Sequence, residues 1–132
     1  MPISYRISAP ENLVSTKAEG TLTDADIIDH KERLSEDQDF VPGMLELSDV
    51  RDVTTLEVTP EGIQRFTAFD KDNSESARGH RLAIVASEDF IFGMARMYQI
   101  QAPEGHETGV SVFRTIEEAR SWLGLDGASP AP

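Results

Sequence analysis

A chain of 132 residues with 39% hydrophobic and 27% charged residues has the composition of one globular domain, not of a disordered chain. The absence of cysteine excludes disulfides, thiolate metal sites and a cysteine nucleophile. With 24 acidic against 12 basic residues, the formal charge is −12, which disfavours nucleic acid and anionic membranes as partners.

The first residues predict a β-hairpin. Apolar and polar side chains alternate over 3–8, a period typical of a strand with one buried face. Residues 9–12 contain proline and asparagine and are expected to form a turn. The β-branched residues over 13–19 then indicate the returning strand.

A helix is expected to follow, over 24–34. Thr23 is a good N-cap, and Asp24 and Asp26 suit the positive end of the helix dipole. Apolar residues at 27, 28 and 34 would face the core. The residues expected on the outer face are His30, Lys31, Glu32 and Arg33.

The middle of the chain predicts a strand at 45–47, an acidic turn at 48–55 and a short extended piece at 56–58. Thr59 followed by Pro60 is a strong helix opening, because threonine caps the helix and proline lacks an N–H that would be unpaired there anyway. Apolar residues recur at 63, 66 and 69 on the inner face of that helix.

The last part continues this alternation. The apolar run 81–86 predicts a strand covered on both faces, and helix 88–100 and strand 109–113 follow it. Thr115 and Glu118 have the spacing of a capping box, which opens a final helix over 116–123. The polar stretch 70–79 is expected to hold the end of the preceding helix and an exposed loop, and 102–108 is expected to be a loop.

The predicted order is β-β-α-β-α-β-α-β-α, an α/β layer fold with a mixed five-stranded sheet and four helices. We expect one domain over residues 1–125 and a flexible C-terminal tail over 126–132.

Five motifs in this order resemble the STAS family, the fold of bacterial anti-sigma factor antagonists, and related STAS-like and CRAL-TRIO-like bacterial single-domain proteins. The motifs lie at 3–7, 19–24, 49–53, 93–98 and 112–119. The resemblance covers residues 3 to 124 and implies a cytoplasmic, non-catalytic regulatory module. Antagonists carry a phosphorylated Ser or Thr in an Asp-Ser-Gly type turn. This chain has Thr54 and Thr55 in that region and no Ser-Gly.

The acidic turn is the first candidate site, since α/β sheets bind ligands at the carboxyl ends of their strands. Its polar groups either hold a partner or form a solvated turn in which Arg51 pairs with a neighbouring aspartate. The two threonines are phosphate acceptors or ordinary strand residues. The candidates for partner binding are Asp49, Arg51, Asp52, Thr54 and Thr55.

The helix over 88–100 carries the second candidate site. Its large apolar residues either pack in the core, line a pocket for a lipid-like molecule or form a dimer face. Polar groups would stand at the rim. The candidates are Phe90, Ile91, Met94, Met97 and Tyr98, with Arg96 and Tyr98 as the polar groups at the rim.

No pattern for nucleotide binding or serine hydrolysis occurs, and the three histidines lack metal-ligand spacing. We therefore expect no enzyme, cofactor or metal. No apolar run is long enough for a membrane span. The sequence predicts a bacterial, homodimeric interaction module with an unknown protein partner. The alternative is a small apolar-ligand binding protein.

Overall fold

The computed structural model describes residues 2–41, 43–72, 81–101 and 109–125, with the side chains of 70–72 and 98–101 excepted. Residues 73–79 of the stretch predicted at 70–79, the loop predicted at 102–108 and the tail predicted at 126–132 lie outside these residues. The elements are β1 (Ile3–Ser8), β2 (Leu13–Thr23), α1 (Asp24–Ser35), β3 (Leu45–Glu57), α2 (Pro60–Asp72), β4 (Arg81–Val85), α3 (Asp89–Gln101), β5 (Gly109–Phe113) and α4 (Ile116–Trp122).

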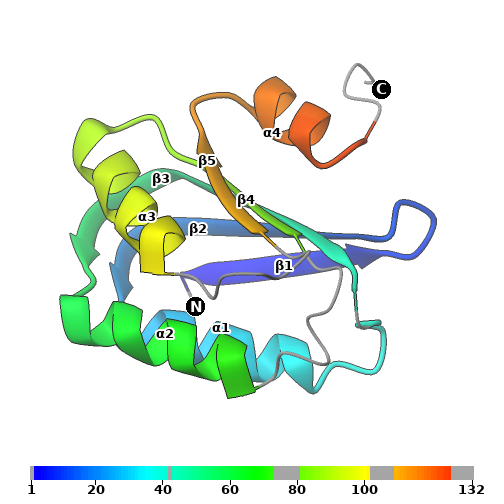
Figure 1. The fold of residues 1–132 in the computed structure, drawn as a ribbon, viewed down its shortest axis with the longest axis horizontal. Helices are drawn as coiled ribbons and strands as arrows, with labels where there is room; N and C mark the ends of the chain where they lie inside the picture. The colour runs from blue at the N-terminus through cyan, green and yellow to red at the C-terminus, as the bar shows by residue number, and fades with distance from the viewer. Residues whose placement is uncertain (1, 42, 73–80, 102–108, 126–132) are drawn as a thin grey trace.

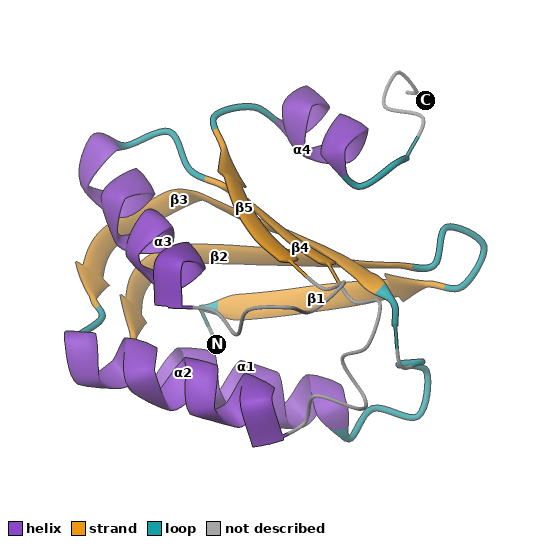
Figure 2. Cartoon of the chain, viewed as in Figure 1, coloured by secondary structure: helices purple, strands orange, loops and turns teal. Residues whose placement is uncertain are grey.

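The five strands form one sheet in the order β1-β2-β3-β4-β5. β1 pairs antiparallel with β2, and β2 to β5 are parallel. Three successive right-handed crossovers in one direction place α1, α2 and α3 on the same face of the sheet. The α4 helix lies on the opposite face (Figures 1 and 2). The predicted mixed sheet with four helices is confirmed.

Each face of the sheet has its own core. On the three-helix face Val50, Ile63 and Phe66 are among the buried residues that pack together. On the α4 face Leu13 and Leu123 belong to a separate buried cluster. The inner strands of the sheet are therefore covered on both faces, as the apolar run in β4 indicated.

Threonine caps begin three of the helices, as predicted. The Thr23 Oγ1 atom accepts the Asp26 N–H at 3.2 Å and opens α1. Thr59 Oγ1 accepts the Gly62 N–H at 3.0 Å and opens α2. Thr115 caps α4, and its side chain accepts the N–H of residue 118 at 3.2 Å.

The acidic turn predicted at 48–55 is wrong, because β3 runs unbroken through it and pairs with β2. The pairing has two irregularities, and at each of them β3 has one residue more than β2. The aligned pairs around them are Lys17–Asp49 and Glu19–Asp52, then Gly20–Val53 and Thr21–Thr55. Bulges break the period of two, so Val50 and Val53 are both buried although three positions apart. This broken alternation has the polarity pattern of a turn.

Candidate functional site

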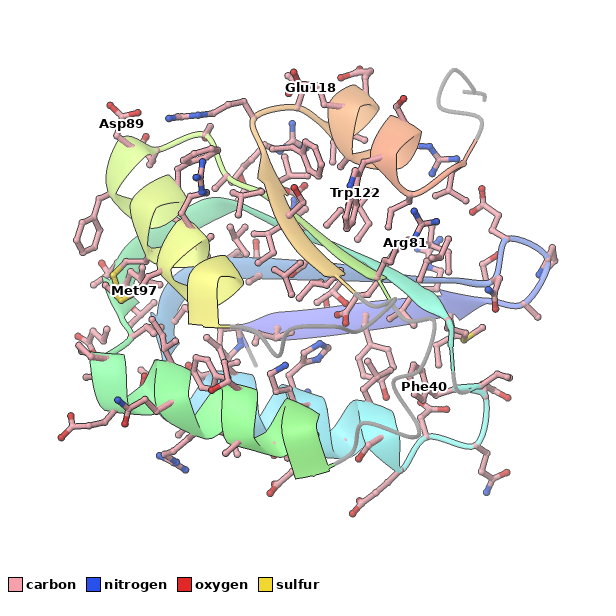
Figure 3. The ribbon with its side chains drawn as sticks, in the orientation of Figure 1. Phe40, Arg81, Asp89, Met97, Glu118 and Trp122 are labelled. Carbon is pink, nitrogen blue, oxygen red and sulfur yellow. The ribbon has the colours of Figure 1, made fainter. Side chains whose placement is uncertain are left out.

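A pocket of about 200 Å³ lies between the sheet and the layer formed by α1, α2 and α3. Strands β1 to β4 and all three helices contribute to its wall, which is mostly apolar. Representative apolar wall residues are Val50, Ile84, Ile63, Phe66, Ile91 and Met94. Phe40, in the segment after α1, also lines it (Figure 3). A concave, mainly apolar pocket with few polar groups is the usual form of a small-molecule site.

Three buried polar side chains line this pocket together. Thr16 on β2 is 4% exposed, and His30 on α1 and Glu46 on β3 are each 7% exposed. The Thr16 hydroxyl donates to Glu46 Oε2 at 2.6 Å, and His30 Nε2 lies 3.0 Å from the same oxygen. These three are the buried polar or charged residues of the described ranges, and they lie together at the pocket.

One atom of this cluster has no partner. His30 Nδ1 is buried and makes no hydrogen bond with any residue that the structure describes. The Tyr5 ring packs edge-on against the imidazole, with the ring centroids 5.6 Å apart. Buried polar groups are nearly always hydrogen-bonded, and leaving one unpaired costs about 1–3 kcal/mol. The orphan nitrogen is therefore a feature that needs an explanation.

The expectation that His30 faces outward is wrong, and the sequence contains a signal against it. Ile27, His30 and Leu34 have helical spacing and occupy one face of α1, so His30 lies within the apolar stripe. Glu46 gives no such local signal. It alternates with Leu45 and Leu47 and has the pattern of a solvent-facing residue. Its burial follows from the cover on both faces of β3.

The first candidate site is a set of ion pairs along β3. Arg51 donates to both carboxylate oxygens of Asp49 at 2.9 Å. This hydrogen bond holds the pKa of Asp49 below its usual value and raises that of Arg51. Asp52 pairs with Lys17 at 2.8 Å. Each of these charges has a partner within the domain. Arg51 thus pairs with a neighbouring aspartate, as in the second of the two alternatives given for this segment.

The remaining members, Thr54 and Thr55, are exposed at the far end of β3. They are accessible to a kinase or a partner protein, and their role in either remains a prediction.

The second candidate site is divided between two faces of α3. Ile91 and Met94 line the pocket. Phe90 is 66% exposed and Met97 is 36% exposed, and Arg96 is exposed as well. Figure 3 shows the Met97 side chain beside α3. The Tyr98 side chain lies outside the described part of the chain. The pocket residues come mainly from other elements, which the sequence did not bring together.

The described helices include none with the length and hydropathy to cross a bilayer. Among the same residues, no cluster of three or more His, Asp or Glu has an arrangement that would hold a metal ion.

The fold is that of the STAS-like α/β domains. It is similar to the crystal structure of an uncharacterised protein of the DUF3478 family with a SpoIIAA-like fold from Shewanella loihica PV-4. The TM-score is 0.60 at 18% identity, over 92% of this chain and 93% of that one. The predicted STAS-like resemblance is confirmed at the level of fold. No protein-family model and no curated protein sequence matches the chain.

Proposed function

We propose that this protein binds a small, mostly apolar molecule in the pocket between the sheet and α1–α3, as a carrier or sensor. The observation that carries the proposal is the pocket itself, because a concave and mostly apolar wall with few polar groups is the usual form of a small-molecule site. A volume of about 200 Å³ is roughly seven times the share of one water molecule in the liquid. It suits a ligand with on the order of ten non-hydrogen atoms and is small for a drug-sized compound.

We further propose that the protein binds its ligand without chemistry. A nucleophile needs an adjacent base, and that base needs an orienting group. Here the Thr16 hydroxyl donates to Glu46 rather than to His30, so the imidazole is not placed to take its proton. This order of contacts supports binding rather than acyl transfer.

A STAS-like regulatory module that binds a protein partner is the second candidate. The likeness of fold supports it, although one fold hosts many functions. The exposed apolar side chains of Phe90 and Met97 on α3 also suit a protein surface. The two functions are compatible if an occupied pocket alters that surface.

Native mass spectrometry of freshly purified protein, followed by denaturation, tests the carrier directly. We expect a folded species with an added mass that denaturation releases. Ala18→Leu should abolish this mass, because Ala18 lines the pocket and a larger side chain would fill it. Ala68→Leu, at an exposed position of α2, is the matched control and should keep it.

If no added mass appears, titration calorimetry with octan-1-ol repeats the test with a known probe. Heat of binding in the wild type and the Ala68→Leu variant, lost in the Ala18→Leu variant, supports the carrier. No binding in any of the three overturns it and leaves the regulatory module.

A further inference from the structure

The outer face of α3 combines apolar side chains with charges of both signs. Between positions 89 and 97 of this helix, the exposed residues are Asp89, Phe90, Gly93, Arg96 and Met97. At about 100° of rotation per residue, these five positions fall within an arc of about 120°. We call them the outer stripe. The other four residues of this span are buried or half-buried. Within the stripe, Phe90 and Met97 lie on one flank of Gly93, and Asp89 and Arg96 lie on the other.

The outer stripe belongs to the last helix of its layer. Helix α1 packs on α2, and α2 packs on α3, so α3 stands at the end of the three-helix row (Figure 1). It also packs on β5, which is an edge strand of the sheet. A single exposed apolar side chain is ordinary. Here two of them, Phe90 and Met97, lie two helical turns apart along one line at the margin of the fold.

Gly93 occupies the middle of the stripe, although the domain itself does not require a glycine there. Its backbone is helical and has no positive φ. A Cβ atom at this position would meet nothing within 4 Å, so alanine would fit. Glycine inside a helix is also less stable than alanine. What a glycine does provide is a low point on the helix surface, at which a second helix can approach closely.

The charges of the stripe are balanced, unlike those of the chain as a whole. A formal charge of −12 opposes contact between two copies over most of the surface. The stripe has one aspartate and one arginine. Asp89 accepts a hydrogen bond from Arg114 at 2.9 Å, and a carboxylate has room for further donors. Arg96 is exposed and makes no hydrogen bond or ion pair with the described part of the chain.

We propose that two copies of this chain associate through the outer stripes of their α3 helices, which run antiparallel about a two-fold axis beside Gly93. The two-fold axis keeps each flank on its own side and reverses its direction. Phe90 therefore faces the partner's Met97, and Asp89 faces the partner's Arg96. Each contact occurs twice, as in any two-fold interface. The stripe is thus complementary to itself in both polarity and charge, and this association needs no ligand in the pocket.

The first test is the oligomeric state of the wild-type protein as a function of concentration. One pair of helices buries less than the roughly 1,200–2,000 Å² of a standard interface, so we expect a dissociation constant on the order of 10–100 µM. Analytical ultracentrifugation over a concentration series that spans this range measures it.

Two charge reversals then test the pairing between the copies. Asp89→Arg places arginine against arginine, and Arg96→Glu places acid against acid. Because both inter-copy contacts become repulsive, each variant alone should dimerise about tenfold more weakly or worse. An equimolar mixture of the two variants should recover the wild-type affinity, since opposite charges then meet at both contacts. Both variants remain strongly acidic, so attraction between oppositely charged proteins does not explain a recovery.

Matched reversals on α2 are the controls. Glu61 lies in the first turn of α2, as Asp89 does in α3, and Arg65 is exposed one turn later. Glu61→Arg and Arg65→Glu should each dimerise like the wild type.

A cross-link tests the same interface without changing its charges. The chain has no cysteine, so Gly93→Cys introduces one thiol beside the proposed two-fold axis. Disulfides form between residues whose Cα atoms are about 4.4–6.8 Å apart. We expect oxidation to convert Gly93→Cys to a covalent dimer. Ala68→Cys, at an exposed position of α2, should stay largely monomeric under the same conditions.

Four results would overturn the proposal. The first is a wild-type protein that stays monomeric throughout the series. The second is a dimer that survives both reversals at positions 89 and 96, which would place the contact elsewhere, for example at the edge of β5. The third is a mixture of the two folded variants that does not recover the dimer. If a reversal variant does not fold, the cross-link decides, and equal oxidation of Gly93→Cys and Ala68→Cys would be the fourth.

Discussion

Two acidic residues of β3, Asp49 and Glu46, each contact a nitrogen-bearing side chain, and the two contacts differ in their surroundings. Asp49 and Arg51 are joined by two hydrogen bonds at the surface, and each is satisfied by the other. Glu46 and His30 are buried, and their cluster leaves one nitrogen without a partner. The comparison teaches that a run of charged residues in the sequence indicates a solvent-exposed surface. A buried polar pair with an unsatisfied atom instead indicates a candidate functional site.

The largest expected effect comes from breaking the buried pair on one side. His30→Leu removes the contact between the imidazole and the buried Glu46 carboxyl group, and losing one partner of a buried polar group typically costs about 3 kcal/mol in the free energy of unfolding. Removing both partners, in His30→Leu/Glu46→Met, should restore most of that loss. Urea denaturation of the two variants measures the difference. Equal stabilities for the single and double variants would contradict the coupling between the two residues.

A polar joint between α1 and α2 gives the next largest effect, although it lies at the surface. Asp24 accepts the Thr59 N–H at 2.9 Å and the Thr59 hydroxyl at 2.6 Å. A Cβ atom at Gly62 would collide with the Asp24 carboxylate. We expect Gly62→Ala to lower the free energy of unfolding by roughly 2 kcal/mol through overpacking.

Gly93 in α3 is the matched control for that substitution. A Cβ atom there meets nothing within 4 Å, so Gly93→Ala should raise the free energy of unfolding by about 0.5–1 kcal/mol through helix propensity. Thermal unfolding of both variants checks the opposite signs. Equal destabilisation by the two alanines would mean that the Asp24 contact does not limit Gly62.

The smallest effect is expected at the exposed pair. Arg51→Ala should change the free energy of unfolding by less than about 1 kcal/mol, since surface ion pairs contribute little. The pKa of Asp49 should rise toward its usual value, because the hydrogen bond from Arg51 is the main cause of its lowering. An NMR titration of the Asp49 carboxyl group measures this shift.

The sign of the pH dependence follows from the lowered pKa. A carboxyl group whose folded pKa lies below the unfolded value contributes stability above that unfolded value, and the contribution is lost as pH falls through the folded pKa. As pH falls, the free energy of unfolding of the wild type should therefore decrease more steeply than that of the Arg51→Ala variant. A variant with the same acid profile would show that the pair makes no contribution.

Much of the fold could be predicted from local patterns, because its signals are local. The caps at Thr23, Thr59 and Thr115 were predicted and are confirmed by short hydrogen bonds within one helical turn. The order of strands and helices followed from apolar periodicity.

The site depends on contacts that no short window contains. Glu46 and His30 are 16 residues apart, and Thr16 and Glu46 are 30 residues apart. A strand that alternates leucine with glutamate indicates a half-exposed strand until a helix is known to cover its polar face. The bulges of β3 misled the prediction for a related reason, because register is set by the partner strand and not by the strand itself.

The pocket wall draws on residues from Ile3 in the first strand to Ala95 in the third helix. A cavity assembled from segments so far apart forms late, after every crossover on that face has docked, because non-local contacts carry the cost of closing long loops. If a molecule binds there, as we propose, it would stabilise the folded chain by mass action. In the cell, the concentration of ligand would then help to set the amount of this protein that folds and persists.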